Sequence, residues 1–151
     1  THPAMGIITL FFHILLFITP LFLTAHNIIS DLTIGVSLFT LSERLSDTFT
    51  ILLISIGGFF LARRIFIPRV RVISTVRDYL MLLFVMSPFV SAFIAYHHFF
   101  NYHVVIFIHM IIGEIAIMAV PFTGLVHMPF IIFSRFFIDS EYSIIPGNRI
   151  W

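Results

Sequence analysis

The sequence predicts an all-α integral membrane protein, built as a bundle of four transmembrane helices. Of its 151 residues, 60% are hydrophobic and 10% are charged, whereas a soluble domain carries about a quarter charged residues. Its 20 phenylalanines and mean hydropathy of +1.11 exceed what the interior of so short a chain can enclose. The apolar residues also fall into four stretches, each long enough to cross a bilayer core of about 30 Å. Together these observations exclude an ordinary water-soluble globule.

The four predicted spans follow one another along the chain. They cover residues 5–27, 45–67, 79–96 and 103–126. Residues 30–46 are weakly apolar, and we expect an interfacial helix or a loop lying on the membrane. We take residues 1–138 as the transmembrane domain. Residues 139–151 contain Pro146 and Gly147, and are expected to leave the membrane as an irregular C-terminal tail.

The arginine positions predict the orientation in the membrane. Five of the eight arginines lie in residues 63–77, and the chain has no lysine. Because basic residues in short loops stay in the cytoplasm, we expect this loop, the N-terminus and the C-terminal tail on the cytoplasmic side of the cell (plasma) membrane. A net charge of +1, with its arginines gathered in one loop, does not fit a nucleic-acid partner. The expected surroundings are membrane lipid.

Histidine is the polar residue that most needs explaining, since the chain has eight histidines and no cysteine. The first and fourth predicted spans hold two each, namely His13, His26, His109 and His127. An ionisable group inside a span is functional by default. Because these spans run antiparallel, the first histidine of one lies level with the last of the other. This layout is typical of two bis-histidine hemes, one near each membrane face.

Helical phase supports the fourth span as a ligand helix. His109 and His127 are 18 residues apart, which is five turns, or roughly 27 Å along one face of a helix. Gly113 and Ala116 lie close to the same stripe, and such small residues leave room to pack a porphyrin.

The first span fits less directly. On a straight helix His26 points about 140° away from His13, although Pro20 between them can introduce a kink that changes the phase. For any single histidine, a hydrogen bond to a neighbour is the milder interpretation. A structural zinc site is disfavoured, because each level supplies two histidines and no thiolate.

Two stretches resemble the cytochrome b (gamma) subunit of respiratory nitrate reductase. One is residues 62–71, which read ARRIFIPRVR and are followed by Ser74, Thr75 and Asp78. The other is residues 109–127, with the same histidine spacing and the letters PF and LVH near its end. Similar membrane cytochromes b serve sulfite-reduction-associated and heterodisulfide-reductase-like complexes. The likeness covers almost the whole chain, although the family normally has five spans, one of them before the first ligand helix.

The resemblance implies a diheme cytochrome b that oxidises a quinol, either menaquinol or ubiquinol. It pairs His13 with His127 on the inner heme and His26 with His109 on the outer heme. The electrons would pass to a cytoplasmic iron-sulfur subunit, and from there to a catalytic subunit of a kind that can contain molybdenum.

Further candidates lie at the two membrane faces. The quinol-site candidates at the outer entrance are Arg44, His98 and His103. Glu43, Asp47, His97 and His26 are further candidates for the group that accepts the hydroxyl protons. The candidates for contacts to heme propionates or to a docked subunit are Arg63, Arg64, Arg69 and Arg71, because a guanidinium binds carboxylates bidentately. The alternative function is a non-redox membrane anchor or assembly subunit that retains the fold with one heme or none.

Overall fold

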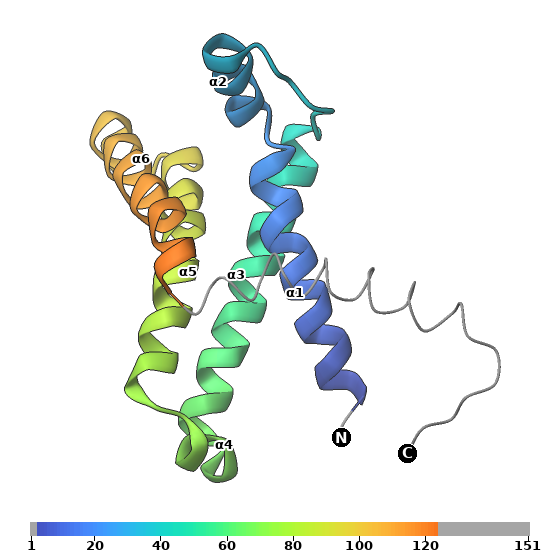
Figure 1. The fold of residues 1–151 in the computed structure, drawn as a ribbon, viewed down its shortest axis with the longest axis vertical. Helices are drawn as coiled ribbons and strands as arrows, with labels where there is room; N and C mark the ends of the chain where they lie inside the picture. Colours follow the sequence, from blue (N-terminus) through green and yellow to red (C-terminus); the bar gives the residue numbers. More distant parts are fainter. Residues whose placement is uncertain (1–2, 124–151) are drawn as a thin grey trace, which may run out of the picture. The chain divides into compact units, whose positions relative to one another are not determined.

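The structure, a computed structural model, describes residues 3–123, and this part of the chain is helical and contains no strand. Its elements are α1 (Pro3–Leu21), α2 (Thr24–Ile34), α3 (Glu43–Phe66), α4 (Pro68–Ile73), α5 (Val76–Tyr96), α6 (Tyr102–Ala119) and the 3₁₀ turn η1 (Val120–Phe122) (Figure 1). The chain forms two compact units, residues 1–113 and 114–151. From the second unit the structure describes the end of α6 and η1, after which the Thr123 hydroxyl donates to the Ala119 carbonyl at 2.8 Å.

The first unit is organised around α3, which packs against both α1 and α5. With 24 residues this helix is about 36 Å long, enough to cross a bilayer core. The buried core is small and contains Phe12 and Leu15 of α1, Leu53 of α3 and Met86 of α5. Most of the large apolar side chains therefore point away from this core, toward the surroundings of the helices.

Helices α3 and α5 approach closely at Gly57. A Cβ atom placed on Gly57 would lie 2.5 Å from the Met86 sulfur, so the Met86 side chain occupies the space that any larger residue would need. The adjacent Gly58 would meet nothing within 4 Å. One of two neighbouring glycines thus allows the helix contact, and the other faces open space.

The prediction of four apolar helices is confirmed for the part of the chain that the structure describes. Four helical segments are long and apolar enough to cross a membrane: Ala4–Leu21, Glu43–Phe66, Val76–Tyr96 and Tyr102–Phe122. The last three begin within three residues of the predicted starts. Residues 124–126, the predicted end of the fourth span, lie outside the described residues.

The prediction of the first span was wrong in one respect, because residues 5–27 are not one continuous helix. Helix α1 ends at Leu21, and α2 starts at Thr24 after Leu23, whose backbone is extended at φ −70° and ψ 130°. Polar side chains just after the break bond to its carbonyl oxygens and compete with helical pairing. Hydropathy does not detect such a break, since the residues around it are as apolar as those of the helix.

Asn27 ties the break together from a buried position. Its amide nitrogen donates to the carbonyl oxygens of Leu21 at 2.9 Å and Leu23 at 3.1 Å. Its side-chain oxygen accepts the Leu38 backbone N–H at 2.6 Å, which holds the segment after α2 against the break. With 5% of its surface exposed, Asn27 satisfies three backbone groups that water does not reach easily.

The connection after the first span and the connection after α3 both contain helix. Residues 30–46, predicted as an interfacial helix or loop, comprise the end of α2, an irregular stretch and the first turn of α3. Gly35 ends α2 at φ 69°, a backbone conformation that favours glycine. Within residues 63–77, the short helix α4 starts at Pro68 and α5 then starts with a capping box between Thr75 and Asp78.

Candidate cofactor site

The structure brings His26 and His109 together. Their ring centroids lie 6.2 Å apart and their ring planes differ by 11°. His26 belongs to the first turn of α2, and His109 lies in the middle of α6. Because α2 starts anew at Thr24, the phase of α1 does not fix the direction of His26. The break in the first span thus removes the 140° mismatch that a straight helix would impose.

Hydrogen bonds fix the tautomer of both imidazoles. His26 Nδ1 lies 2.9 Å from the Pro20 carbonyl oxygen, and His109 Nδ1 lies 3.1 Å from the Pro88 carbonyl oxygen. A carbonyl oxygen can only accept, so each Nδ1 carries the hydrogen and each Nε2 keeps a lone pair. Within residues 3–123, neither Nε2 has a hydrogen-bond partner.

A proline inside α5 shapes the acceptor for His109. Pro88 has no N–H to give the Phe84 carbonyl, which instead accepts the Ser87 hydroxyl at 2.7 Å. The buried Ser91 hydroxyl donates to the Pro88 carbonyl at 2.9 Å and lies 3.0 Å from His109 Nδ1. The His109 N–H is therefore shared between a carbonyl and a hydroxyl oxygen.

Two imidazoles, one from α2 and one from α6, could together supply two nitrogen ligands to a metal, whose bonds to imidazole are about 2.0–2.1 Å long. A heme iron takes four further ligands from its porphyrin and suits a two-histidine site. Residues 3–123 contain no group of three or more side chains able to hold a metal ion by themselves.

The surroundings of His109 leave room on its helix. A Cβ atom added at Gly113, one turn after His109, would meet nothing within 4 Å. Ala116 lies in the part of α6 that belongs to the second unit, so its position relative to the histidine pair stays a prediction. Small residues in this stripe were expected to accommodate a flat macrocycle.

The inner histidine pair stays a prediction, because His127 lies outside the described residues. His13 is part of α1, and its Nδ1 lies 2.7 Å from the carbonyl oxygen of Thr9, one turn earlier. That contact selects the same tautomer as in His26 and His109. The ring of Phe12 meets His13 edge-on, with centroids 5.8 Å apart.

The three predicted quinol-site residues do not form a cluster of contacts. Arg44 lies in the first turn of α3 and forms no ion pair within residues 3–123. His98 adopts a positive φ of 52°, and its ring centroid lies 5.2 Å from that of Tyr102. The backbone N–H of His103 donates to the Asn101 side chain at 3.1 Å. The structure gives none of these three a side-chain hydrogen bond to another.

His97 and Asp47, by contrast, do form an acid–base pair. His97 Nε2 lies 3.0 Å from the Asp47 carboxylate, with 33% and 23% of the two side chains exposed. Aromatic rings surround the imidazole, and the ring centroid of Phe93 is 4.3 Å away. The sequence places both residues near the outer face but cannot show that they meet, since 50 positions separate them and only the packing of α3 on α5 joins them.

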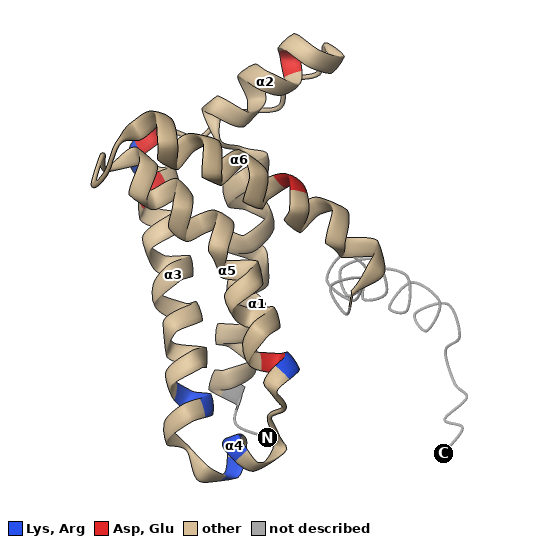
Figure 2. Ribbon diagram, turned by 90° about the vertical axis from the view of Figure 1, so that its left-hand side faces the viewer, with Lys and Arg blue, Asp and Glu red and all other residues tan. Residues whose placement is uncertain are grey.

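The arginine candidates lie at the far end of α3 from Asp47. Arg63 and Arg64 belong to the last turn of α3, and Arg69 and Arg71 to α4 (Figure 2). Arg64 Nη1 lies 3.8 Å from the carboxylate of Asp78. The other three form no ion pair in the described part of the chain. This end therefore presents several cations without nearby counter-ions.

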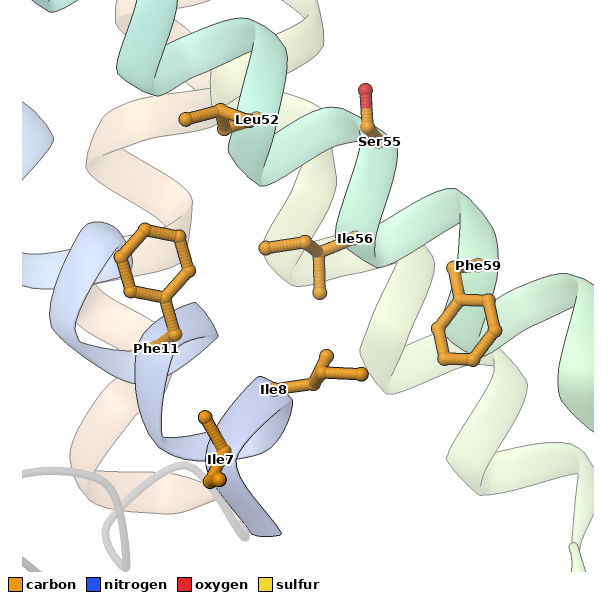
Figure 3. A pocket seen from close by; sticks show the side chains of 7 residues that line it. All are labelled: Ile7, Ile8, Phe11, Leu52, Ser55, Ile56 and Phe59. Atoms are coloured by element: carbon orange, nitrogen blue, oxygen red, sulfur yellow. The ribbon is translucent and has the colours of Figure 1, made fainter. Parts of the chain in front are cut away.

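An apolar depression of about 340 Å³ lies between α1 and α3 (Figure 3). It is lined by Ile7, Ile8, Phe11, Leu52, Ser55, Ile56 and Phe59. The one polar side chain among them, Ser55, points away and donates its hydroxyl to the Ile51 carbonyl at 2.7 Å. The lining can contact hydrocarbon but offers no polar group to orient a substrate.

Comparison with known proteins gives one informative match. Over 147 residues the chain is 36% identical to a protein of Nitratidesulfovibrio vulgaris Hildenborough, whose name, "Protein", states no activity. The match covers 97% of this chain and 65% of that protein, so the chain spans a little less than two thirds of its relative's length. No family model matches the chain, and no solved structure matches it.

Proposed function

We propose that this chain is the membrane-anchoring diheme cytochrome b subunit of a respiratory oxidoreductase. In this proposal it transfers electrons between the quinone pool and an iron-sulfur subunit on the cytoplasmic side, as its resemblance to the nitrate reductase gamma subunit implies. Heme b is held by His26 and His109 near the outer face and by His13 and His127 near the inner face. Bound heme supplies one-electron redox chemistry, which the side chains of this chain cannot provide.

The geometry of His26 and His109 is the observation that carries the proposal. Two imidazoles from different helices meet at 6.2 Å, and both donate Nδ1–H to the carbonyl oxygen of a proline. Metal-ligating histidines usually donate their other ring N–H in this way, which fixes the ring and makes its free nitrogen a better ligand. The Nε2 lone pair of each imidazole would then be available to a metal.

The exposed side chains support placement in a membrane. Ile7, Leu10 and Phe107 are 67%, 60% and 62% exposed in the isolated chain, and similar residues cover the faces of all four long helices. Burying such area in lipid contributes about 25 cal/mol per Å². By the positive-inside rule, the arginines at the end of α3 and on α4 favour a cytoplasmic location for that end. Asp47, His26 and His109 then lie toward the outer face.

The residues at the two ends would do different work. At the outer end, the carbonyl oxygens of Pro20 and Pro88 orient the two ligand imidazoles. At the cytoplasmic end, Arg63, Arg69 and Arg71 offer guanidinium groups to carboxylates of a docked electron-transfer subunit. Such a partner is part of the proposal, because the resemblance to the gamma subunit implies it.

A reduced-minus-oxidised spectrum of the purified protein tests the proposal. We expect b-type bands that account for two hemes per chain. The His109→Ala variant should retain one heme, and imidazole added to a His109→Gly variant should restore the second band. His98→Asn is the matched control, because asparagine tolerates the positive φ at this position, and it should keep both hemes.

Two outcomes would contradict the assignment. A wild-type spectrum without b-type bands would rule out the cytochrome and leave the non-redox anchor as the better explanation. Full heme content in both His26→Ala and His109→Ala would show that these residues are not the ligands. Because the spectrum counts hemes directly, neither outcome depends on the identity of the catalytic partner.

A further inference from the structure

We propose that the pair of His97 and Asp47 is the proton acceptor for a hydroquinone bound at the outer end of α3 and α5. This inference rests on the proposed function and deepens it, because it assigns residues to the substrate's hydroxyl groups. Among the candidates at the outer entrance, it selects the two residues that the structure joins rather than Arg44, His98 and His103.

The contact with Asp47 prepares His97 to act as a base. The carboxylate accepts the Nε2–H bond at 3.0 Å, so the lone pair of the imidazole is on Nδ1. Within residues 3–123, Nδ1 has no hydrogen-bond partner, and a third of the His97 side chain is exposed. When the imidazole takes a proton, the adjacent carboxylate stabilises the new positive charge.

The position of the pair connects it to the candidate cofactor site. His97 caps the C-terminus of α5, the helix whose Pro88 and Ser91 hold His109. The six residues from Ser91 to His97 correspond to about 9 Å along the helix axis. The rings of Phe93 and Phe99, with centroids 4.3 and 5.8 Å from that of His97, offer an apolar surface for a flat quinone ring.

The proposed step is the oxidation of one hydroquinone, which breaks two O–H bonds and yields one quinone, two protons and two electrons. Each proton passes to His97 Nδ1 and from there to water on the outer side, since the side chain is partly exposed. A heme held by His26 and His109, as in the proposed function, would accept the two electrons.

Few other ionisable groups surround the pair. Tyr96 meets His97 edge-on with centroids 5.2 Å apart, and Glu43 and Arg44 lie one turn before Asp47 on α3. Neither Glu43 nor Arg44 forms an ion pair within residues 3–123. Asp47 is therefore the one charged group that contacts the imidazole in this part of the molecule.

Asp47→Asn is the most informative variant, because an amide oxygen can still accept the Nε2–H bond while the negative charge is lost. The rate of heme reduction by tetramethylhydroquinone can be measured by stopped flow on the heme-loaded chain. It should be about 10²-fold slower in both Asp47→Asn and His97→Gln than in the wild type. The rate of heme reduction by dithionite should be unchanged in both variants. Asp31→Asn, which alters an exposed carboxylate of α2, is the control and should change neither the rate with tetramethylhydroquinone nor the rate with dithionite.

A binding measurement separates this inference from the proposed function. Anaerobic equilibrium dialysis with tetramethylhydroquinone should show about 10-fold weaker binding in His97→Gln, the loss expected for one hydrogen bond. Unchanged rates and binding in both variants, with b-type bands intact, would overturn the inference and leave the cytochrome standing. An equal loss of rate with tetramethylhydroquinone and with dithionite in both variants would also overturn it, because that pattern indicates a structural tie between helices.

Discussion

Asn27 shows how single side chains determine where the first helix ends. This buried amide replaces helical pairing at the break with hydrogen bonds to Leu21, Leu23 and Leu38. The next residue back, His26, then bonds to the Pro20 carbonyl and faces His109. The position of the His26–His109 pair therefore depends on a residue that does not belong to it.

We predict that Asn27→Ala destabilises the protein and releases the outer heme. Three buried backbone groups lose their partner, and each such loss costs about 1–3 kcal/mol when it is not compensated by water. The free energy of unfolding in detergent can be measured by an SDS titration that is monitored by circular dichroism. It should fall by at least the cost of one lost hydrogen-bond partner, about 1–3 kcal/mol. Heme content should drop from two to one.

Thr33→Ala on the same helix is the control, because its exposed hydroxyl bonds only to carbonyls within α2 in the described structure. Thr33→Ala should leave both the free energy of unfolding and the heme content unchanged. If Asn27→Ala lowered stability and kept both hemes, His26 would be positioned by contacts other than the break.

The sequence identified His26 and His109 as a pair but could not predict what orients them. Their selection followed from the cost of an imidazole in hydrocarbon and from their matched depth. The acceptors, by contrast, are backbone carbonyl oxygens of Pro20 and Pro88, and any residue type carries a carbonyl. Which carbonyl a side chain reaches depends on where helices break and cross, and a residue pattern does not specify that.

At the scale of helices, the contact between α3 and α5 depends on one glycine. Gly57 and Gly58 are chemically identical neighbours, yet a Cβ on Gly57 would collide with Met86 and one on Gly58 would meet nothing. Membrane helices use small residues in this way to let backbones approach. Hydropathy cannot tell the two glycines apart, because the distinction lies in which face of α3 meets α5.

We predict that Gly57→Leu and Gly58→Leu differ sharply. Leucine at position 57 displaces Met86 and separates the helices, at a cost of about 1–3 kcal/mol for overpacking. Leucine at position 58 projects into open space and replaces a poor helix former, so stability should stay level or rise by up to about 1 kcal/mol. Thermal unfolding of both variants in the same detergent measures the difference.

A second change tests the mechanism. Shortening Met86 to alanine in the Gly57→Leu background should recover part of the loss, because the colliding side chain is removed. Equal stabilities for the two leucine variants would show that α3 and α5 do not pack through Gly57.

At the scale of the whole chain, the sequence predicted the helical class and the four long apolar helices, because lipid imposes a length and a composition on every span. It placed the helices of the second, third and fourth spans to within a few residues. It missed the division of the first span and the meeting of His97 with Asp47. Both depend on interactions between side chains and distant backbone, which leave no periodic signal.

The orientation of the chain is the last prediction, and the absence of cysteine makes it direct to measure. Single cysteines at Ser37, in the connection after α2, and at Val72, which is 84% exposed on α4, can be labelled without background. The arginines around Val72 should hold that end in the cytoplasm against the membrane potential. A membrane-impermeant maleimide added to intact cells should therefore label Ser37→Cys and spare Val72→Cys until the membrane is opened.

The reverse pattern would place the Asp47 end of α3 in the cytoplasm. His26 and His109 would then lie on the same side as an iron-sulfur partner, and protons accepted by His97 would be released inside the cell. Electron transfer from that side would no longer need to cross the membrane, so the charge separation that the proposed outer quinol site implies would disappear. Labelling at these two positions thus decides between an electrogenic and an electroneutral route without any knowledge of the terminal substrate.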